Sequence, residues 1–185
     1  MSAAVASPLA SNAALDVARV RADFPILTRE VYNKPLVYLD SAASAQKPRV
    51  VIDAESRVYE EEYANVHRGV HYLSQVATDK FEATRKRIQT FLNAGDENEI
   101  VFVRGGTEGI NLVAQSWGRA NLKEGDEILI SELEHHANIV PWHLLAAERG
   151  LVVKGIPIHD DGQIDMEAYK GLLNERTKMV PLTQM

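Results

Sequence analysis

Short apolar runs alternate with segments of helical periodicity along the second half of the chain, and this alternation limits the folds available to it. The runs that resemble strands cover residues 100–103, 127–131, 151–158 and 178–183. The segments with helical spacing cover residues 107–120, 138–149 and 165–173. A strand followed by a helix and then another strand is typical of a parallel sheet with crossover helices. The sequence therefore predicts an α/β fold.

Upstream of this region, the sequence predicts two helices and little regular structure before them. Helical periodicity covers residues 49–63 and 74–93, and Gly95 is the expected stop of the second helix. Residues 1–18 are rich in Ala and Ser and contain no Lys or Arg. They lack the basic start of a secretory signal and the arginines of a transit peptide. We interpret them as a disordered tail of a cytoplasmic protein.

The composition argues against several classes of protein. The chain of 185 residues has a formal net charge of -6 at pH 7 and no strongly basic stretch, which disfavours nucleic-acid binding. No apolar run is long enough to cross a membrane. The chain contains no cysteine, which excludes a disulfide, a thiolate metal site and a cysteine nucleophile within these residues.

Gly105, Gly106 and Thr107 stand where the first apolar run meets the helix that follows it. A helix start carries unpaired N–H groups and the positive end of the helix dipole, so it attracts anions. Glycines let the backbone approach a ligand and a threonine hydroxyl adds a donor, so these residues are a candidate phosphate site. The string is neither the dinucleotide fingerprint nor a Walker motif. A tight turn followed by an N-cap threonine explains it equally well.

Histidines cluster in two other strings. His135 and His136 fall in the loop after the next predicted strand. Ligands of open parallel sheets bind outside the carboxyl ends of the strands, where a histidine can stack on a flat ligand or move protons. The string NVHRGVHYLS groups His67, Arg68 and His71 before the long predicted helix.

Metal binding is the alternative for these histidines. His67 and His71 are four residues apart, which is a possible ligand spacing on a helix. However, there is no H-E-x-x-H motif, and Gly69 weakens a helix between the two. Adjacent histidines such as His135 and His136 rarely ligate one metal together. No metal site is therefore predicted, and a surface or hydrogen-bonding role is the default for any single histidine.

Four strings of the sequence together resemble one family of enzymes. They are YLDSAASAQKP at residues 38–48, NVHRGVHYLS at 65–74, VFVRGGTEGINLVAQSWG at 101–118 and EHHANIVPWHLL at 134–145. In this order they resemble the class V aminotransferase family of pyridoxal-phosphate (PLP) enzymes, and within it the SUF-type (group II) cysteine desulfurases. The resemblance runs from about Val20 to the end of the chain.

The resemblance implies the fold type I of PLP-dependent transferases, with a parallel or mixed sheet and crossover helices. It divides the chain into a disordered tail (residues 1–18), a segment of the small domain with the entry to the large domain (19–48), and the first part of the PLP-binding large domain (49–185). Members of the family are longer than this chain. The chain is therefore expected to be the front half of the enzyme, with an incomplete sheet.

The resemblance also implies which residues bind the cofactor. Many relatives have two threonines at the start of the helix after VFVRG. Here Gly106 replaces the first, and Thr107 matches the second. His135 matches the histidine that stacks on the pyridine ring and takes part in proton transfers. Gly106, Thr107 and His135 are thus the implied cofactor-binding residues, and His135 is also the implied catalytic residue.

Four further residues are implied on the substrate side. Ala42 and Ala43 match the small residues beside the substrate. His67 and Arg68 match residues that line the substrate side of the pocket.

The implied activity is that of a PLP-dependent cysteine desulfurase, which removes sulfur from L-cysteine to give L-alanine and an enzyme persulfide for iron–sulfur cluster assembly. The family implies a homodimer and a SUF-type sulfur-acceptor protein. The Schiff-base lysine, the aspartate on the pyridine nitrogen and the persulfide cysteine are expected beyond Met185, so this chain alone is expected to be inactive. Two alternatives stay open: a selenocysteine lyase or another class V relative, and a non-catalytic domain that binds a phosphate ligand or a partner.

Overall fold

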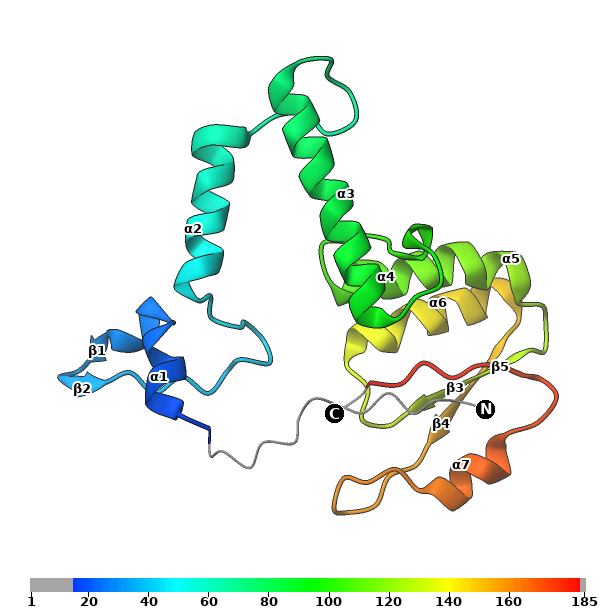
Figure 1. Ribbon diagram of the computed structural model, residues 1–185. Coiled ribbons are helices and arrows are strands. Elements are labelled where there is room, and N and C mark those ends of the chain that lie inside the picture. The colour runs from blue at the N-terminus through cyan, green and yellow to red at the C-terminus, as the bar shows by residue number, and fades with distance from the viewer. Residues whose placement is uncertain (1–14, 184–185) are drawn as a thin grey trace, which may run out of the picture. The chain divides into compact units, whose positions relative to one another are not determined.

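The computed structural model describes residues 15–183 and divides the chain into two compact units (Figure 1). The first unit reaches to Ile100 and the second begins at Val101. Within the described residues, no helix combines the length and the apolar character that crossing a bilayer requires. Residues 1–14 of the predicted tail lie outside the described range. The division of the chain at residues 19 and 49 stays a prediction.

The first unit begins with short elements. They are α1 (Val17–Ala22), the 3-10 helix η1 (Pro25–Thr28), β1 (Glu30–Val31) and β2 (Lys34–Pro35). The two strands form an antiparallel hairpin that was not predicted from the sequence. Tyr32 and Asn33 at its turn have φ values of 53° and 58°. Positive φ at both turn residues is the geometry of a two-residue turn that matches the twist of the strands.

Two longer helices follow in the first unit and confirm the predicted ones. The first is α2 (Arg49–Arg57), which continues into the π-helical turn η2 (Val58–Glu62), and the second is α3 (Tyr72–Leu92). The predicted stop at Gly95 is wrong, because α3 already ends at Leu92 and is capped by Asn93, whose φ is 54°. Asparagine tolerates this left-handed conformation because its short polar side chain can hydrogen-bond locally.

The second unit alternates helices and strands, as predicted. Its helices are α4 (Gly106–Val113), η4 (Ala114–Gly118), α5 (Arg119–Asn121), η5 (His136–Asn138), α6 (Val140–Arg149) and α7 (Met166–Leu172). Its strands are β3 (Glu127–Ser131), β4 (Val152–Ile156) and β5 (Thr177–Met179). The first three helical segments follow one another without a break, which matches the single helix predicted over residues 107–120.

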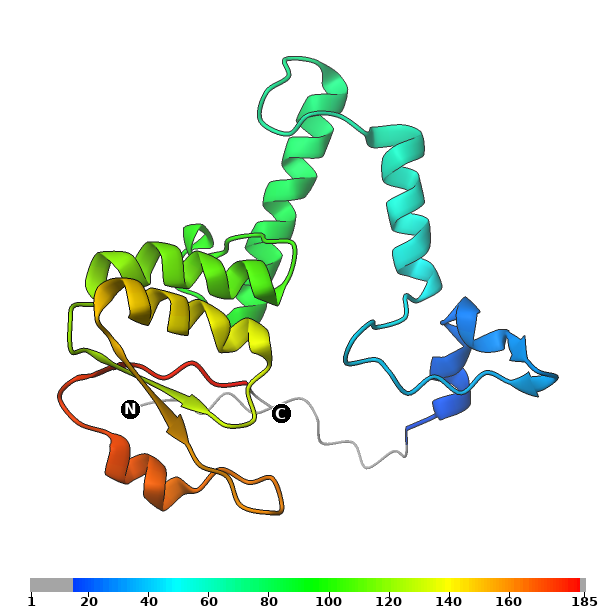
Figure 2. The same ribbon diagram turned by 180° about the vertical axis from the view of Figure 1, so that it is seen from behind.

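The strands of the second unit form a parallel sheet in the order β4-β3-β5. All five residues of the central strand β3 are buried. Figures 1 and 2 show α5 and α6 over the same face of this sheet. The core lies between that face and the helices, and its buried members are Ala114, Leu122, Ile128, Ile130, Trp142, Leu145, Ala146 and Leu151. The predicted α/β fold with a parallel sheet and crossover helices is confirmed.

The predicted strand over residues 100–103 is wrong. In the described structure, the three strands of the sheet pair with one another and not with this segment. Val101 keeps 62% of its surface exposed, and the Ile100 carbonyl accepts a hydrogen bond from the Arg85 guanidinium. An apolar run becomes a strand only where a second strand offers backbone partners, and apolar character alone does not supply them.

Candidate functional site

The start of α4 is exposed, and its backbone is open. Gly105, Gly106 and Thr107 are all exposed, and the Gly105 carbonyl accepts the first helical hydrogen bond from the Gly109 N–H (3.1 Å). A Cβ added at Gly105 or Gly106 would meet no atom within 4 Å. The first turn therefore has room for a ligand against its backbone, and the start of a helix favours an anion.

A carboxylate in the first turn of α4 is already neutralised. Glu108 Oε2 accepts hydrogen bonds from the Arg104 backbone N–H (2.6 Å) and from Arg104 Nε (3.1 Å). The Arg104 side chain, and then its backbone N–H, hold the pKa of Glu108 below its usual range. Because the guanidinium balances this charge, Glu108 does not make the helix start repel an anion.

His135 follows β3 and begins the short helix η5. Its side chain is exposed, and its Nδ1 accepts a hydrogen bond from the Ala137 N–H (3.1 Å). In the neutral imidazole the proton must then sit on Nε2, which is the atom available to a ligand. The ring of His136 meets it edge-on, with 6.1 Å between the centroids.

A buried carboxylate that was not predicted from the sequence lies directly before His135. Glu134 is 7% exposed, and each of its oxygens accepts two hydrogen bonds. Oε1 accepts from Ser131 Oγ (2.8 Å) and the Thr183 N–H (3.0 Å). Oε2 accepts from Asn138 Nδ2 (2.7 Å) and Thr183 Oγ1 (2.7 Å). Asn138 Oδ1 in turn accepts from Trp142 Nε1 (3.0 Å) in the core.

Burial acts to raise the pKa of Glu134, but the hydrogen bonds from Thr183, Asn138 and Ser131 outweigh it and leave the pKa lowered. Glu134 is therefore a buried anion at neutral pH. The spacing of Glu134, Asn138 and Trp142 by four residues was a sequence signal for part of this network, because polar groups at this spacing share a face of a helical segment. Thr183 lies 49 residues from Glu134 along the chain, and no local pattern points to it.

The structure brings the helix of Thr107 and the loop of His135 together. α4 and η5 contact each other. Gly109 of α4, Asn138 of η5 and Thr183 line one cavity of about 320 Å³. His135 lies beyond the carboxyl end of β3, as predicted, whereas Thr107 follows a segment that is not a strand.

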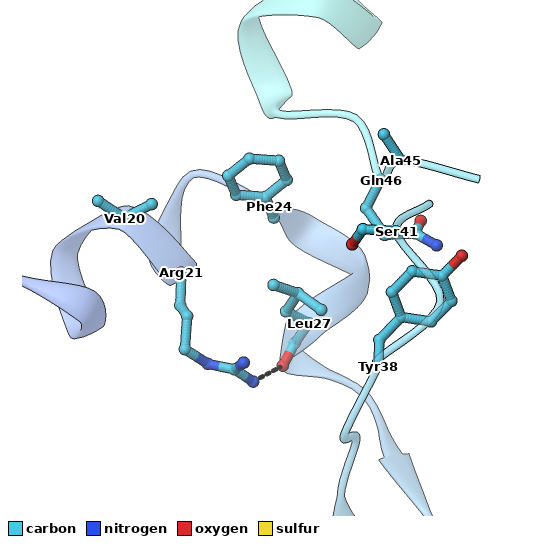
Figure 3. A pocket seen from close by; sticks show the side chains of 8 residues that line it. All are labelled: Val20, Arg21, Phe24, Leu27, Tyr38, Ser41, Ala45 and Gln46. Carbon is cyan, nitrogen blue, oxygen red and sulfur yellow. Dashed lines mark hydrogen bonds between the residues drawn. The ribbon is translucent and has the colours of Figure 1, made fainter. Parts of the chain in front are cut away.

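The residues predicted on the substrate side all lie in the first unit. Ala42 and Ala43 form an exposed turn. The Tyr38 hydroxyl lies between the two sides of this turn and shares its one proton between the Asp40 carbonyl (3.0 Å) and the Ser44 carbonyl (2.5 Å). Figure 3 shows Tyr38 beside a cavity of about 350 Å³ in the same unit. The turn is thus held from its ends, and its two alanines remain accessible.

His67 and Arg68 lie in an exposed loop that is attached to α3. The His67 N–H donates to Thr78 Oγ1 (3.0 Å), and His67 Nε2 lies 2.9 Å from Glu82 Oε1. The His67 ring also meets Phe81 edge-on, with 5.7 Å between the centroids. Among residues 15–183, no group of three or more His, Cys, Asp or Glu side chains could hold a metal ion.

Over residues 37–185, the sequence matches the family described as Aminotransferase class-V, and the chain therefore belongs to that family. It is 57% identical over 169 residues to a cysteine desulfurase of Klebsiella pneumoniae subsp. pneumoniae, with 91% of this chain and 42% of the relative covered. It is 55% identical to a cysteine desulfurase of Escherichia coli O7:K1, with the same coverage. The chain thus spans about 42% of the length of these relatives.

Solved structures agree with the family assignment. The apo structure of cysteine desulfurase from Thermococcus onnurineus NA1 superposes with a TM-score of 0.80 at 38% identity, covering 90% of this chain and 39% of that one. The cysteine desulfurase CsdA (S-sulfonic acid) from Escherichia coli superposes with a TM-score of 0.71 at 39% identity, covering 88% and 40%. The predicted fold type I of PLP-dependent transferases is confirmed for the part of that fold that this chain spans.

The family uses PLP, and the residues present fit two parts of that cofactor. The open start of α4 suits a phosphate dianion because its N–H groups and dipole favour negative charge. The exposed His135 imidazole suits a flat ring. The hydrogen bond that it accepts from the Ala137 N–H is made at the edge of the ring, at Nδ1, and does not cover a face of the imidazole.

Proposed function

We propose that the protein containing this chain is a PLP-dependent cysteine desulfurase, which removes sulfur from L-cysteine and yields L-alanine and an enzyme persulfide for iron–sulfur cluster assembly. The observation that carries the proposal is the contact between the helix with an open start, α4, and the loop of an exposed imidazole, His135. The 57% identity to a cysteine desulfurase over 91% of the chain supports the choice among PLP reactions.

Each cofactor-binding residue has a defined task in this proposal. The N–H groups at Gly106 and Thr107, together with the Thr107 hydroxyl, bind the phosphate. His135 limits the tilt of the ring from one face and holds or moves a proton at Nε2, because its Nδ1 is occupied by the Ala137 N–H. When bound, PLP supplies an electron sink for a carbanion.

The substrate side of the proposal uses the residues of the first unit. Ala42 and Ala43 leave space for the substrate, and His67 and Arg68 line its pocket. The Schiff-base lysine, the pyridine-nitrogen aspartate and the persulfide cysteine belong to parts of the enzyme that this chain does not contain. A homodimer, a SUF-type acceptor protein and a cytoplasmic location complete the proposal.

A pair of neighbouring histidines offers a matched test in the full-length protein. His135→Ala should slow alanine formation from L-cysteine while the protein still takes up PLP, and His136→Ala should be milder. A free-PLP control with an unrelated protein is needed because free PLP reacts with cysteine by itself. If His136→Ala is the more damaging change, the assignment of the stacking role to His135 is wrong. If the wild type forms alanine no faster than the control, the proposed function is wrong.

The phosphate site has its own test. Removing a hydrogen bond to a charged group costs roughly 1.5–3 kcal/mol, so Thr107→Ala should weaken PLP binding by about tenfold or more. A cofactor titration of the full-length variant measures this. Unchanged affinity would remove Thr107 from the site.

A further inference from the structure

Glu134 is the buried charge of the second unit that lies closest in sequence to the proposed stacking histidine. Its four hydrogen-bond donors are all neutral groups, at 2.7–3.0 Å. A buried carboxylate is costly unless its lone pairs are satisfied. Here neutral hydrogen-bond donors stabilise the negative charge, a role that an opposite charge often has in other proteins. The four bonds therefore fix the carboxylate in one position.

The same four bonds tie together three segments around His135. Ser131 is the last residue of β3, Asn138 is the last residue of η5, and Thr183 lies beyond β5. Glu134 precedes His135 and Asn138 follows it, so the network holds the backbone both before and after His135. Asn138 is itself fixed by its bond from Trp142 Nε1, and Trp142 is 2% exposed. The loop is thus anchored to the core of the unit.

The His135 side chain has little packing of its own. It is exposed, and its hydrogen bond is the one that Nδ1 accepts from the Ala137 N–H, within the same loop. This bond exists only if the backbone of residues 135–137 keeps its present turn. The direction of the imidazole and the position of its proton therefore depend on the backbone of residues 135–137. That backbone depends in turn on the four hydrogen bonds of Glu134.

We infer that Glu134 is a positioning residue, which acts through the backbone of residues 134–138 to fix the direction and the tautomer of His135. The inference rests on the proposed function in one respect, which is that His135 faces PLP. Glu134 itself touches neither substrate nor cofactor. It determines whether Nε2 of His135 carries the proton and whether the ring lies in the orientation for stacking.

Glu134→Gln is a sharp variant because a glutamine cannot satisfy this site in either orientation. With its NH2 group at the Oε1 position, the amide would face the Thr183 N–H, which cannot reverse. With its NH2 group at the Oε2 position, it would face Asn138 Nδ2, which cannot flip without turning its oxygen away from Trp142. One pair of donors clashes either way, although size and shape are unchanged. Glu132→Gln is the matched control, since Glu132 is exposed two residues away.

The experiment uses the full-length protein with nitrogen-15-labelled histidine, first without PLP and then loaded with PLP. His135→Gln identifies the His135 signals. In wild type and Glu132→Gln, the nitrogen shifts of His135 should report a single tautomer with its proton on Nε2. In Glu134→Gln they should move toward a tautomer mixture. In the loaded protein, the visible circular dichroism of PLP should change and kcat should fall roughly tenfold to a hundredfold with KM little altered.

Three outcomes overturn the inference. One is a Glu134→Gln protein whose melting temperature falls while the His135 shifts stay as in wild type, because Glu134 is then only structural. Another is a change in the His135 nitrogen shifts of Glu132→Gln that equals the change in Glu134→Gln. If Glu134→Gln does not fold, Thr183→Val removes one donor to Oε2 and keeps the N–H to Oε1, and unchanged His135 shifts in that variant overturn the inference as well. If the wild type has no desulfurase activity, the proposed function alone is wrong, since the tautomer measurement needs no activity.

Discussion

Two exposed histidines, one in each unit, are held by loops with different anchors. The loop of His67 is attached to α3 by the neutral hydroxyls of Ser74 and Thr78 and by the half-buried Glu82. The loop of His135 is attached by the buried carboxylate of Glu134. His67 is proposed to contact the substrate and His135 the cofactor. Each imidazole must therefore be exposed to its ligand and still be held in one orientation. The difference shows two ways of achieving this in one chain.

The anchors of the first loop follow one face of α3 at intervals of four residues. Ser74 is fully buried, and its Oγ accepts from the Gly69 N–H (2.9 Å) and donates to the Asn65 carbonyl (2.6 Å). Thr78 receives the His67 N–H, and Glu82 receives its imidazole. Residues spaced by four lie above one another on a helix, so a single stripe holds the loop along its length.

The two anchors differ in what a substitution exposes. A buried hydroxyl is neutral, so losing it leaves one donor and one acceptor without a partner. A buried carboxylate that loses donors leaves a charge in a poor solvent, which is far less favourable. The loop held by the Glu134 carboxylate should therefore be more sensitive to the loss of a hydrogen-bond donor than the loop held by the Ser74 hydroxyl.

The largest effect is expected where a second charge is placed against Glu134. Asn138→Asp would put a carboxylate oxygen where Asn138 Nδ2 now lies, 2.7 Å from Glu134 Oε2. Uncompensated buried charge costs roughly 3–5 kcal/mol of unfolding free energy, so we expect a loss of that size at pH 7. Because the two carboxyls must share a proton, their joint pKa is raised, and the stability should recover as the pH is lowered. Urea denaturation at pH 7 and pH 5 measures both effects.

Asn33→Asp is the matched control, since Asn33 lies in an exposed turn that tolerates aspartate. It should change the free energy of unfolding by no more than about 0.5 kcal/mol at either pH. A similar loss in both variants would mean that added charge, and not its position against Glu134, is responsible.

The pH dependence of the Glu134 network gives the next effect. Its folded pKa is lowered from an ordinary value of 4.5, so its stabilising contribution is present above that value and is lost as the pH falls through the folded pKa. Glu134→Gln should be less stable than wild type by about 2 kcal/mol at pH 7, and the gap should narrow below pH 4.5. Glu127 also has a lowered pKa, so the difference between the two proteins is the quantity to follow. A gap that stays constant with pH would show that Glu134 is not held as an anion.

The sequence predicted most of the elements that depend on neighbours along the chain, with the β1–β2 hairpin as an exception, and missed contacts that depend on distant residues. The helices α3 and α6 follow from their own apolar spacing, and the position of His135 after β3 follows from its place after an apolar run. The Glu134 network was missed because Thr183 arrives from 49 residues away. The strand at residues 100–103 was predicted in error because a strand depends on a partner that its own residues do not specify. The β1–β2 hairpin was missed because Tyr32 and Asn33 occupy a turn that usually contains glycine.

A comparable effect is expected in the loop of His67, which the neutral hydroxyls of Ser74 and Thr78 attach to α3. A Cβ at Gly69 would overlap the Ser74 side chain, which is fully buried and cannot move aside. Gly69→Ala should therefore reduce the free energy of unfolding by roughly 1–3 kcal/mol. The matched control is Gly171→Ala in α7, where a Cβ meets no atom within 4 Å. It should stabilise by about 0.5–1 kcal/mol, since alanine is the better helix former. Stabilisation by both variants would show that the loop can move away from Ser74.

The smallest effect is expected at Glu82, the charged residue among the three on α3 that hold the loop of His67. The Glu82 side chain is 40% exposed, and it pairs with His67 Nε2 (2.9 Å) and Arg85 Nε (3.1 Å). Exposed ion pairs contribute about 0–1 kcal/mol, so Glu82→Gln should change the free energy of unfolding by no more than that. Ser74→Ala should cost roughly 1–3 kcal/mol because it leaves the Gly69 N–H and the Asn65 carbonyl without their partner. Urea denaturation of both variants gives the comparison directly. If Glu82→Gln is as costly as Ser74→Ala, the loop of His67 is held mainly by a charged side chain, and the contrast with the loop of His135 disappears.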